Sequence, residues 1–212
     1  GLLINRHAQL GSFDLKASTV KVVQQGYKVM MNSQCAGLTT RFAISRLFLD
    51  MRFVGSVPPR TAIETVEGLI AQIEARVDEP DAGPWEFRDR TRLHSFTVLM
   101  HWAGARRAVE IAETLGAEEL ADRALELEAR AADLLETRCW NDEVGALTQV
   151  AGEPQLDAAL LLAIHLGFFA ADDPRAATHV DAIRDQLSLD GGLLRRYSVQ
   201  DDFGVMEAAF TV

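Results

Sequence analysis

The fold is decided by two consecutive stretches, SFTVLMHWAGARRAVEIAETL (residues 95–115) and EELADRALELEARAADLLETR (residues 118–138). In the first stretch, apolar residues recur at helical spacing on two faces: Phe96, Leu99, Met100 and Ala103 on one, and Trp102, Ala105, Val109 and Ala112 on the other. In the second they form one stripe, with acids and arginines opposite: Leu120, Ala124, Leu127, Ala131, Leu134 and Leu135. A helix that is apolar on two faces must be covered on both, whereas a one-sided helix faces water on its polar side. The pair therefore predicts an inner helix followed by an outer one.

Four further stretches have the composition and spacing of helices. Thr61 can cap the first, and Pro174 suits the first turn of the third. Leu156 to Phe169 is nearly all apolar, which predicts another inner helix. The stretches are 61–77, 156–169, 174–190 and 207–212. The alternation of inner and outer helices predicts an all-α fold of two helical layers with about six or seven helices.

The N-terminal residues differ in charge from the rest of the chain. All three lysines lie in residues 1–40, where four basic residues stand against Asp14 alone. This segment therefore carries a formal charge of +3, and the total of −10 leaves −13 for residues 41–212. A solvated basic arm and a segment of different origin both explain the contrast. We divide the chain into an atypical segment, 1–44, and a helical domain, 45–212.

Composition excludes several classes of protein. A hydrophobic content of 48% with 25% charged residues excludes a disordered chain. The net charge of −10 argues against a nucleic-acid partner. No apolar run approaches the length of a membrane span, and the first residues lack the pattern of a signal peptide. We therefore expect no membrane partner. Cys35 and Cys139 cannot build a disulfide framework, so we also expect reduced thiols and a cytoplasmic location.

Common cofactor and metal motifs are absent from the sequence. It has no GxxxxGK[ST], no GxGxxG after a strand, no HExxH and no CxxC. The five histidines have no metal-ligand spacing. We therefore expect neither a metal nor a cofactor.

Two loops combine residues that suit work on a sugar. In GPWEFR (residues 83–88), the indole of Trp85 could pack on sugar C–H groups while the carboxyl of Glu86 reaches a glycosidic oxygen. The second loop, DDFGVME (residues 201–207), brings another carboxyl, Glu207. Both loops lead into expected helices, so the two carboxyls could face one cleft. For each of them, a solvated surface glutamate is the alternative interpretation.

Residues 78–212 resemble the C-terminal part of glycoside hydrolase family 15, the bacterial glucoamylase, glucodextranase and trehalase-like enzymes. Five ordered motifs carry the resemblance. DAGPWEFR (81–88) is similar to the family's DxGIWExR, and FTVLMHW (96–102) is similar to its FxSxxMxW. LDAALLL with GFF and DDPR (156–175) resembles LDASLLL…GFLPxDDPR, RRY (195–197) resembles RY, and DFGVMEAAF (202–210) resembles DFGxPExAF. The sequence departs from the pattern at Pro84, Val98 and Met206.

The resemblance implies an (α/α)6-barrel (toroid) that hydrolyses α-glucosidic bonds with inversion. On that basis Glu86 is the general acid, Glu207 the general base and Trp85 a platform for sugar. Arg88 and Arg196 would bind hydroxyls or set the charge of the carboxylates. The substrate would be an oligosaccharide or disaccharide, such as malto- or isomalto-oligosaccharides, dextran or trehalose. Because the chain is short for a whole barrel, we expect a barrel fragment.

Other outcomes remain open at this stage. A non-catalytic helical scaffold or partner-binding module would hold if Glu86 and Glu207 lay on opposite sides of the fold. A lyase or epimerase on a similar toroid would need a His or Tyr in place of the second carboxyl. An apolar seam left by missing helices would favour a homo-oligomer.

Overall fold

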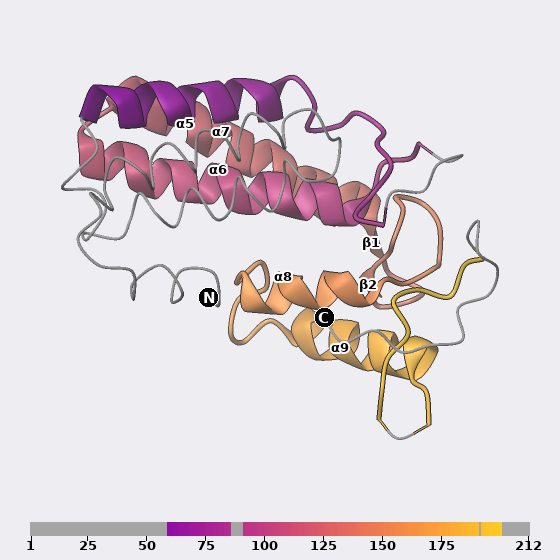
Figure 1. The fold of residues 1–212 in the computed structure, drawn as a ribbon. Coiled ribbons are helices and arrows are strands. Elements are labelled where there is room, and N and C mark those ends of the chain that lie inside the picture. The colour runs from indigo at the N-terminus through magenta and orange to yellow at the C-terminus, as the bar shows by residue number, and fades with distance from the viewer. Residues whose placement is uncertain (1–58, 86–90, 191, 201–212) are drawn as a thin grey trace, which may run out of the picture.

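The computed structural model describes residues 59–85, 91–190 and 192–200. These residues form five α-helices, two turns of other helix types and a two-stranded sheet (Figure 1). The elements are α5 (Pro59–Glu74), α6 (Ser95–Leu115), α7 (Glu118–Leu134), the π-helical turn η1 (Leu135–Cys139), β1 (Trp140–Asn141), β2 (Ala146–Leu147), the 3-10 turn η2 (Ala158–Leu161), α8 (Leu162–His165) and α9 (Pro174–Leu187). The described part of the chain is thus mostly helical, as predicted.

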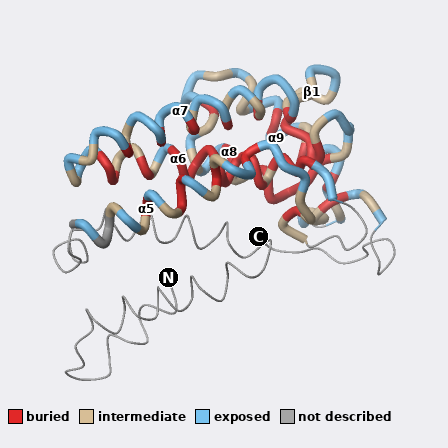
Figure 2. Tube along the Cα trace, turned by 90° about the horizontal axis from the view of Figure 1, so that it is seen from above, coloured by how far each residue is buried: buried red, intermediate tan, exposed pale blue. Residues whose placement is uncertain are grey.

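Helix α6 lies at the centre of this arrangement. It forms an antiparallel hairpin with α7, and α5 packs against both (Figure 1). It also contacts the turns η1 and η2, which belong to the second half of the described chain. From Ser95 to Ala105, every residue of α6 except Phe96 is buried (Figure 2). The prediction of an inner helix with two apolar faces is therefore confirmed.

Helix α7 is one-sided, as its sequence predicts. Its buried residues are Leu120, Ala124, Leu127 and Ala131, which repeat at helical spacing. On the exposed side, two arginines of α7 reach across to the end of α5. Arg123 forms a two-pronged ion pair with Glu74 at 2.7 and 3.1 Å, and Arg130 pairs with Asp78 at 2.9 Å. Such exposed pairs contribute little free energy, so the apolar stripe does most of the stabilising.

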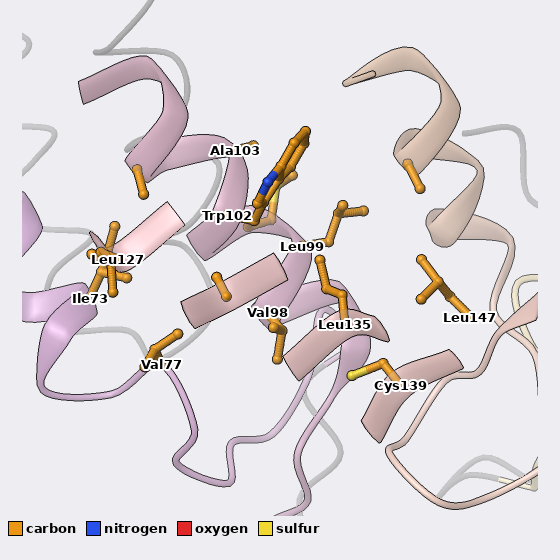
Figure 3. Close-up of a cluster of buried hydrophobic side chains, with 14 of the residues drawn as sticks. Ile73, Val77, Val98, Leu99, Trp102, Ala103, Leu127, Leu135, Cys139 and Leu147 are labelled. Carbon is orange, nitrogen blue, oxygen red and sulfur yellow. The ribbon is translucent and has the colours of Figure 1, made fainter. Parts of the chain in front are cut away.

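The end of α7 changes the face that the chain presents to the core. Continuing the spacing of the stripe would turn Leu134 and Arg138 inward. The π-helical turn η1 is wider than an α-helical turn, and Leu135 and Cys139 are buried instead, while Arg138 is exposed. Figure 3 shows Leu135 and Cys139 in one cluster with Val98 and Leu99 of α6. The turn therefore keeps a charged side chain out of the core.

Two expected helices have different bounds in the structure. The first begins at Pro59, so Thr61 lies inside α5 rather than at its cap; a proline fits the first turn because its missing N–H has no partner there. The expected inner helix over 156–169 is shorter in the structure. Its helical part, η2 followed directly by α8, covers 158–165, because Asp157 before it is extended and pairs with Tyr197, and the chain turns after it at Gly167, whose φ is 74°.

The two-stranded sheet is absent from the sequence-based expectation. Trp140 pairs with Leu147 and Asn141 with Ala146. The amide oxygen of Asn141 accepts from the backbone N–H groups of Glu143 and Val144, which closes the turn. Each strand has only two residues, too few to give an alternating pattern.

Some expectations fall on residues that the structure does not describe. They are the segment 1–44, with its boundary to the helical domain, and the final helix from Glu207. Among the described helices, none has both the length and the apolar character needed to cross a membrane.

We predict that Leu127→Ala lowers the free energy of unfolding by about 2–5 kcal/mol, because it empties space in the α5–α6–α7 core. Leu127 is 3% exposed, whereas Leu125 on the same helix is 56% exposed. Leu125→Ala is the matched control and should change stability by less than about 0.5 kcal/mol. Chemical denaturation followed by circular dichroism measures both; equal losses would contradict the packing described for α7.

Candidate functional site

The structure places two of the five expected site residues. Trp85 lies in the loop between α5 and α6, and Arg196 lies in the segment after α9. The expected acid Glu86, the expected base Glu207 and Arg88 lie outside the described residues. Their roles stay predictions.

Trp85 and Arg196 come together in a small polar and aromatic cluster. The indole Nε1–H of Trp85 donates to Oδ2 of Asp157 at 2.6 Å. The guanidinium carbon of Arg196 lies 5.0 Å from the centroid of the Trp85 ring, a cation–π distance. The Tyr197 ring is 5.9 Å from that of Trp85 and tilted against it by 56°. We call these four residues, Trp85, Asp157, Arg196 and Tyr197, the Trp85 cluster.

Backbone pairing explains why residues so far apart in sequence meet here. Asp157 and Tyr197 form an isolated antiparallel bridge, and Ala158 N–H donates to Arg196 O. This bridge fixes the Arg196 and Tyr197 side chains beside Asp157. Trp85 then joins them from a third segment, the loop before α6.

The loop that carries Trp85 is itself held close to the start of α6. Asp81 exchanges two backbone hydrogen bonds with Arg92, at 2.8 and 3.0 Å, and its Oδ1 accepts from Gly83 N–H at 2.7 Å. Gly83 has φ of 68°, a backbone conformation that favours glycine. A Cβ at this position would lie 2.7 Å from Nδ1 of His94, the buried residue just before α6. The loop therefore rests directly on the His94 ring.

Asp157 is the buried charged group of the cluster, with only 1% of its surface exposed. Its Oδ1 accepts from Ala159 N–H at 2.9 Å, and its Oδ2 accepts from Trp85 and, at 3.5 Å, from Gln149 Nε2. Burial raises the pKa of Asp157 to about 6, although these hydrogen bonds and the charge of Arg196 act to lower it. At neutral pH Asp157 is therefore mostly ionised and serves as an acceptor on both oxygens.

Sequence reasoning missed the part that Asp157, Tyr197 and Gln149 play. Asp157 and Tyr197 entered it only as letters of family motifs. An Asp before Ala158-Ala159 is a typical N-cap, and that signal predicts the bond to Ala159 N–H. No local signal links Asp157 to Trp85, which is 72 residues away.

Within the described ranges, no three His, Cys, Asp or Glu side chains gather in a way that could hold a metal ion. What the Trp85 cluster offers chemically is an aromatic ring and a cation held in fixed positions. A half-buried indole of this kind can pack against the C–H face of a sugar, and a guanidinium can donate to hydroxyls.

We predict that Gly83→Ala destabilises the protein more than Gly116→Ala. Both glycines have positive φ, 68° and 67°, so alanine is strained at each by about 1–2 kcal/mol. Only at Gly83 would the new Cβ meet another group; nothing lies within 4 Å of it at Gly116. The free energies of unfolding of the two variants measure the difference in destabilisation. This difference should shrink when His94 is also changed to Ala. If it persists, contact with His94 is not what destabilises Gly83→Ala.

The pH dependence of stability should carry the signature of Asp157. Its pKa of about 6 in the folded state lies above its ordinary value of 3.8, so the folded state binds this proton more tightly and stability falls as pH rises from 4 through 6. At about 1.4 kcal/mol per pKa unit, the loss is about 3 kcal/mol. Asp157→Asn cannot ionise, so the stability of the natural protein relative to this variant should fall over that range. A difference that is constant with pH would contradict the raised pKa.

Comparison with known proteins gives a consistent result. The sequence model described as glycosyl hydrolases family 15 matches residues 44–211. A trehalase of Mycolicibacterium smegmatis is 38% identical over 138 residues, 63% of this chain and 20% of that protein. A trehalase of Thermoplasma acidophilum is 29% identical over 168 residues, 79% of this chain and 29% of that protein. The chain thus spans less than a third of the length of these relatives.

Solved structures agree on the fold. A bacterial glucoamylase complexed with acarbose has a TM-score of 0.56 at 16% identity, over 83% of this chain and 29% of that chain. A wild-type glycosidase has a TM-score of 0.53 at 23% identity, over 62% and 34% of the two chains. These likenesses confirm the expected fold class, a fragment of an (α/α)6 barrel. Since the family model covers most of its residues, the chain belongs to glycosyl hydrolases family 15.

Proposed function

We propose that the protein to which these residues belong hydrolyses α-glucosidic bonds with inversion, and that its substrate is the disaccharide trehalose. The observation that carries the proposal is the Trp85 cluster, in which the indole of Trp85, the residue before Glu86 in the chain, is held in place beside the guanidinium of Arg196. Family membership supplies the class of reaction. Trehalose is favoured over longer α-glucans because relatives with 37–38% identity are trehalases.

In the proposed reaction, Glu86 is protonated and Glu207 is ionised. Glu207 takes a proton from a water molecule, whose oxygen attacks an anomeric carbon of the sugar. The bond from that carbon to the glycosidic oxygen breaks, and Glu86 gives its proton to the departing oxygen. Inverting enzymes hold the two carboxyls about 6.5–9.5 Å apart to admit the water. We propose this separation for Glu86 and Glu207.

The remaining site residues are proposed to bind the sugar. Trp85 would offer its ring to the sugar C–H groups, and Arg196 would donate to hydroxyls from its place over the same ring. Arg88 would act near the carboxylates as a second cation. The bond from Trp85 to Asp157 supports this assignment, because a platform must keep one orientation to recognise a sugar face.

The domain division also remains a proposal. We propose that residues 45–212 belong to the catalytic domain and that 1–44 lie outside its active site. In the described part of the chain Cys139 is a buried free thiol, in keeping with the proposed cytoplasmic location. Self-association through an apolar seam stays a prediction, to be tested by light scattering.

We predict that the full-length enzyme produces α- and β-glucose in equal initial amounts from trehalose. Water inverts the glucose that it attacks to the β anomer, while the other glucose leaves as the α anomer. Proton NMR of the fresh products, recorded before mutarotation, measures the ratio. An initial product that is α-glucose only would mean retention and would remove Glu207 from the role of base.

We also predict that Glu86→Gln and Glu207→Gln each lower kcat by about 10²–10⁴-fold, the usual share of general acid–base catalysis. Glu79→Gln is the matched control, since Glu79 is an exposed glutamate earlier in the same loop. It should leave kcat unchanged. Steady-state assays on trehalose with maltose as a second substrate measure all three; full activity in either active-site variant would refute the assigned pair.

A further inference from the structure

We propose that Asp157 is a positioning residue for this reaction: its carboxylate fixes the indole of Trp85, the proposed platform for the sugar. The inference rests on the proposed role of Trp85. Its structural basis is the 2.6 Å bond from Trp85 Nε1 to Asp157 Oδ2, which joins the loop before α6 to the segment that opens η2.

The two carboxylate oxygens of Asp157 have separate partners. Oδ1 accepts from Ala159 N–H and so caps η2, while Oδ2 accepts from Trp85. Both partners are N–H donors, so the side chain must accept on both sides. An asparagine would turn its NH2 group toward one of these donors and lose that bond. Only a carboxylate serves both at once.

Capping alone does not account for a carboxylate here. Serine or asparagine caps a helical turn about as well as aspartate and brings no charge. A buried charge is costly unless it is paired and hydrogen-bonded, and Asp157 is 1% exposed. Its cost is offset in part by the Ala159 N–H, by the Trp85 N–H and by the charge of Arg196, which sits over the Trp85 ring. Two of these three partners, Trp85 and Arg196, are residues of the proposed site, so the carboxylate serves more than the cap.

The chain contains a similar bond that can have no such role. Trp140 Nε1–H donates to Asp142 Oδ1 at 2.9 Å, but Asp142 is exposed and lies only two residues further along the chain. This bond does not join two distant segments. Asp142→Ser therefore serves as the matched control for any loss of a Trp–Asp bond.

The experiment is a double-mutant cycle in the full-length enzyme with Asp157→Ser and Trp85→Phe. Serine retains a capping oxygen but is too short to reach Trp85, and phenylalanine removes the N–H donor. Asp157→Ser should lower kcat on trehalose about 10- to 100-fold when Trp85 is present, since a shift of about 1 Å in a catalytic group has this effect. When Phe replaces Trp85, the same change should lower kcat less than about threefold. Asp142→Ser should leave kcat unchanged.

A second readout follows Trp85 directly. In protein labelled with 5-fluorotryptophan, the fluorine resonance of Trp85 is the one lost in Trp85→Phe. It should shift in Asp157→Ser and stay in place in Asp142→Ser. A residue that only caps η2 would move neither this resonance nor the coupling in the cycle.

Equal fold-changes in both backgrounds, or an unmoved Trp85 resonance, would overturn the proposal and leave Asp157 as a cap. If Asp157→Ser does not fold, Asp157→Thr replaces it in the same cycle, because its hydroxyl also caps and is also too short to reach Trp85. An unsubstituted enzyme with no activity on trehalose or maltose would refute the proposed function. In that case the fluorine resonance alone decides whether Asp157 positions Trp85.

Discussion

The burial of the first three turns of α6 on all sides is the constraint on which the described structure depends. From Ser95 to Ala105 every residue except Phe96 is buried, so other elements must cover every face of this part of the helix. Helices α5 and α7 and the turns η1 and η2 all pack against α6. This arrangement also decides where the Trp85 loop lies. His94, just before α6, is the surface on which Gly83 rests, so the position of Trp85 is set relative to the central helix.

The sequence predicts what depends on periodicity and misses what depends on single distant contacts. The two faces of α6 and the stripe of α7 repeat over several turns, and both predictions are confirmed by burial. The stretch 156–169 is equally apolar, but its helical part is limited to 158–165, because Asp157 is held extended by its bridge to Tyr197 and the chain turns at Gly167. Periodicity gives no sign of the distant partner of Asp157. The two-residue strands Trp140–Asn141 and Ala146–Leu147 are too short to leave a pattern at all.

The same distinction holds for the candidate site: some of its residues could be predicted from the sequence and others could not. The composition of its loop and a family motif both single out Trp85, and a family motif singles out Arg196; the structure places the Arg196 guanidinium 5.0 Å from the centroid of the Trp85 ring. Asp157, which holds Trp85, carries a local signal only for capping, since the partner on its other oxygen is distant in sequence. Glu86, Arg88 and Glu207 lie outside the described residues, and their roles still rest on the family pattern alone. Sequence motifs thus indicate the residues that would act on the substrate, whereas only the fold shows the contacts, such as Asp157 to Trp85, that hold them in place.

The π-helical turn at the end of α7 has a consequence for how such a chain can change in evolution. Compared with an α-helix joining the same two ends, η1 contains one residue more, and the excess is absorbed in a single wide turn. Deleting one residue between Ala131 and Cys139 would let the helix run straight into β1 without displacing the strand. Relatives of this chain can therefore differ in length by one residue here and keep the same α6–α7 hairpin. A one-residue deletion in the middle of α6, by contrast, would rotate half of its buried side chains away from their partners.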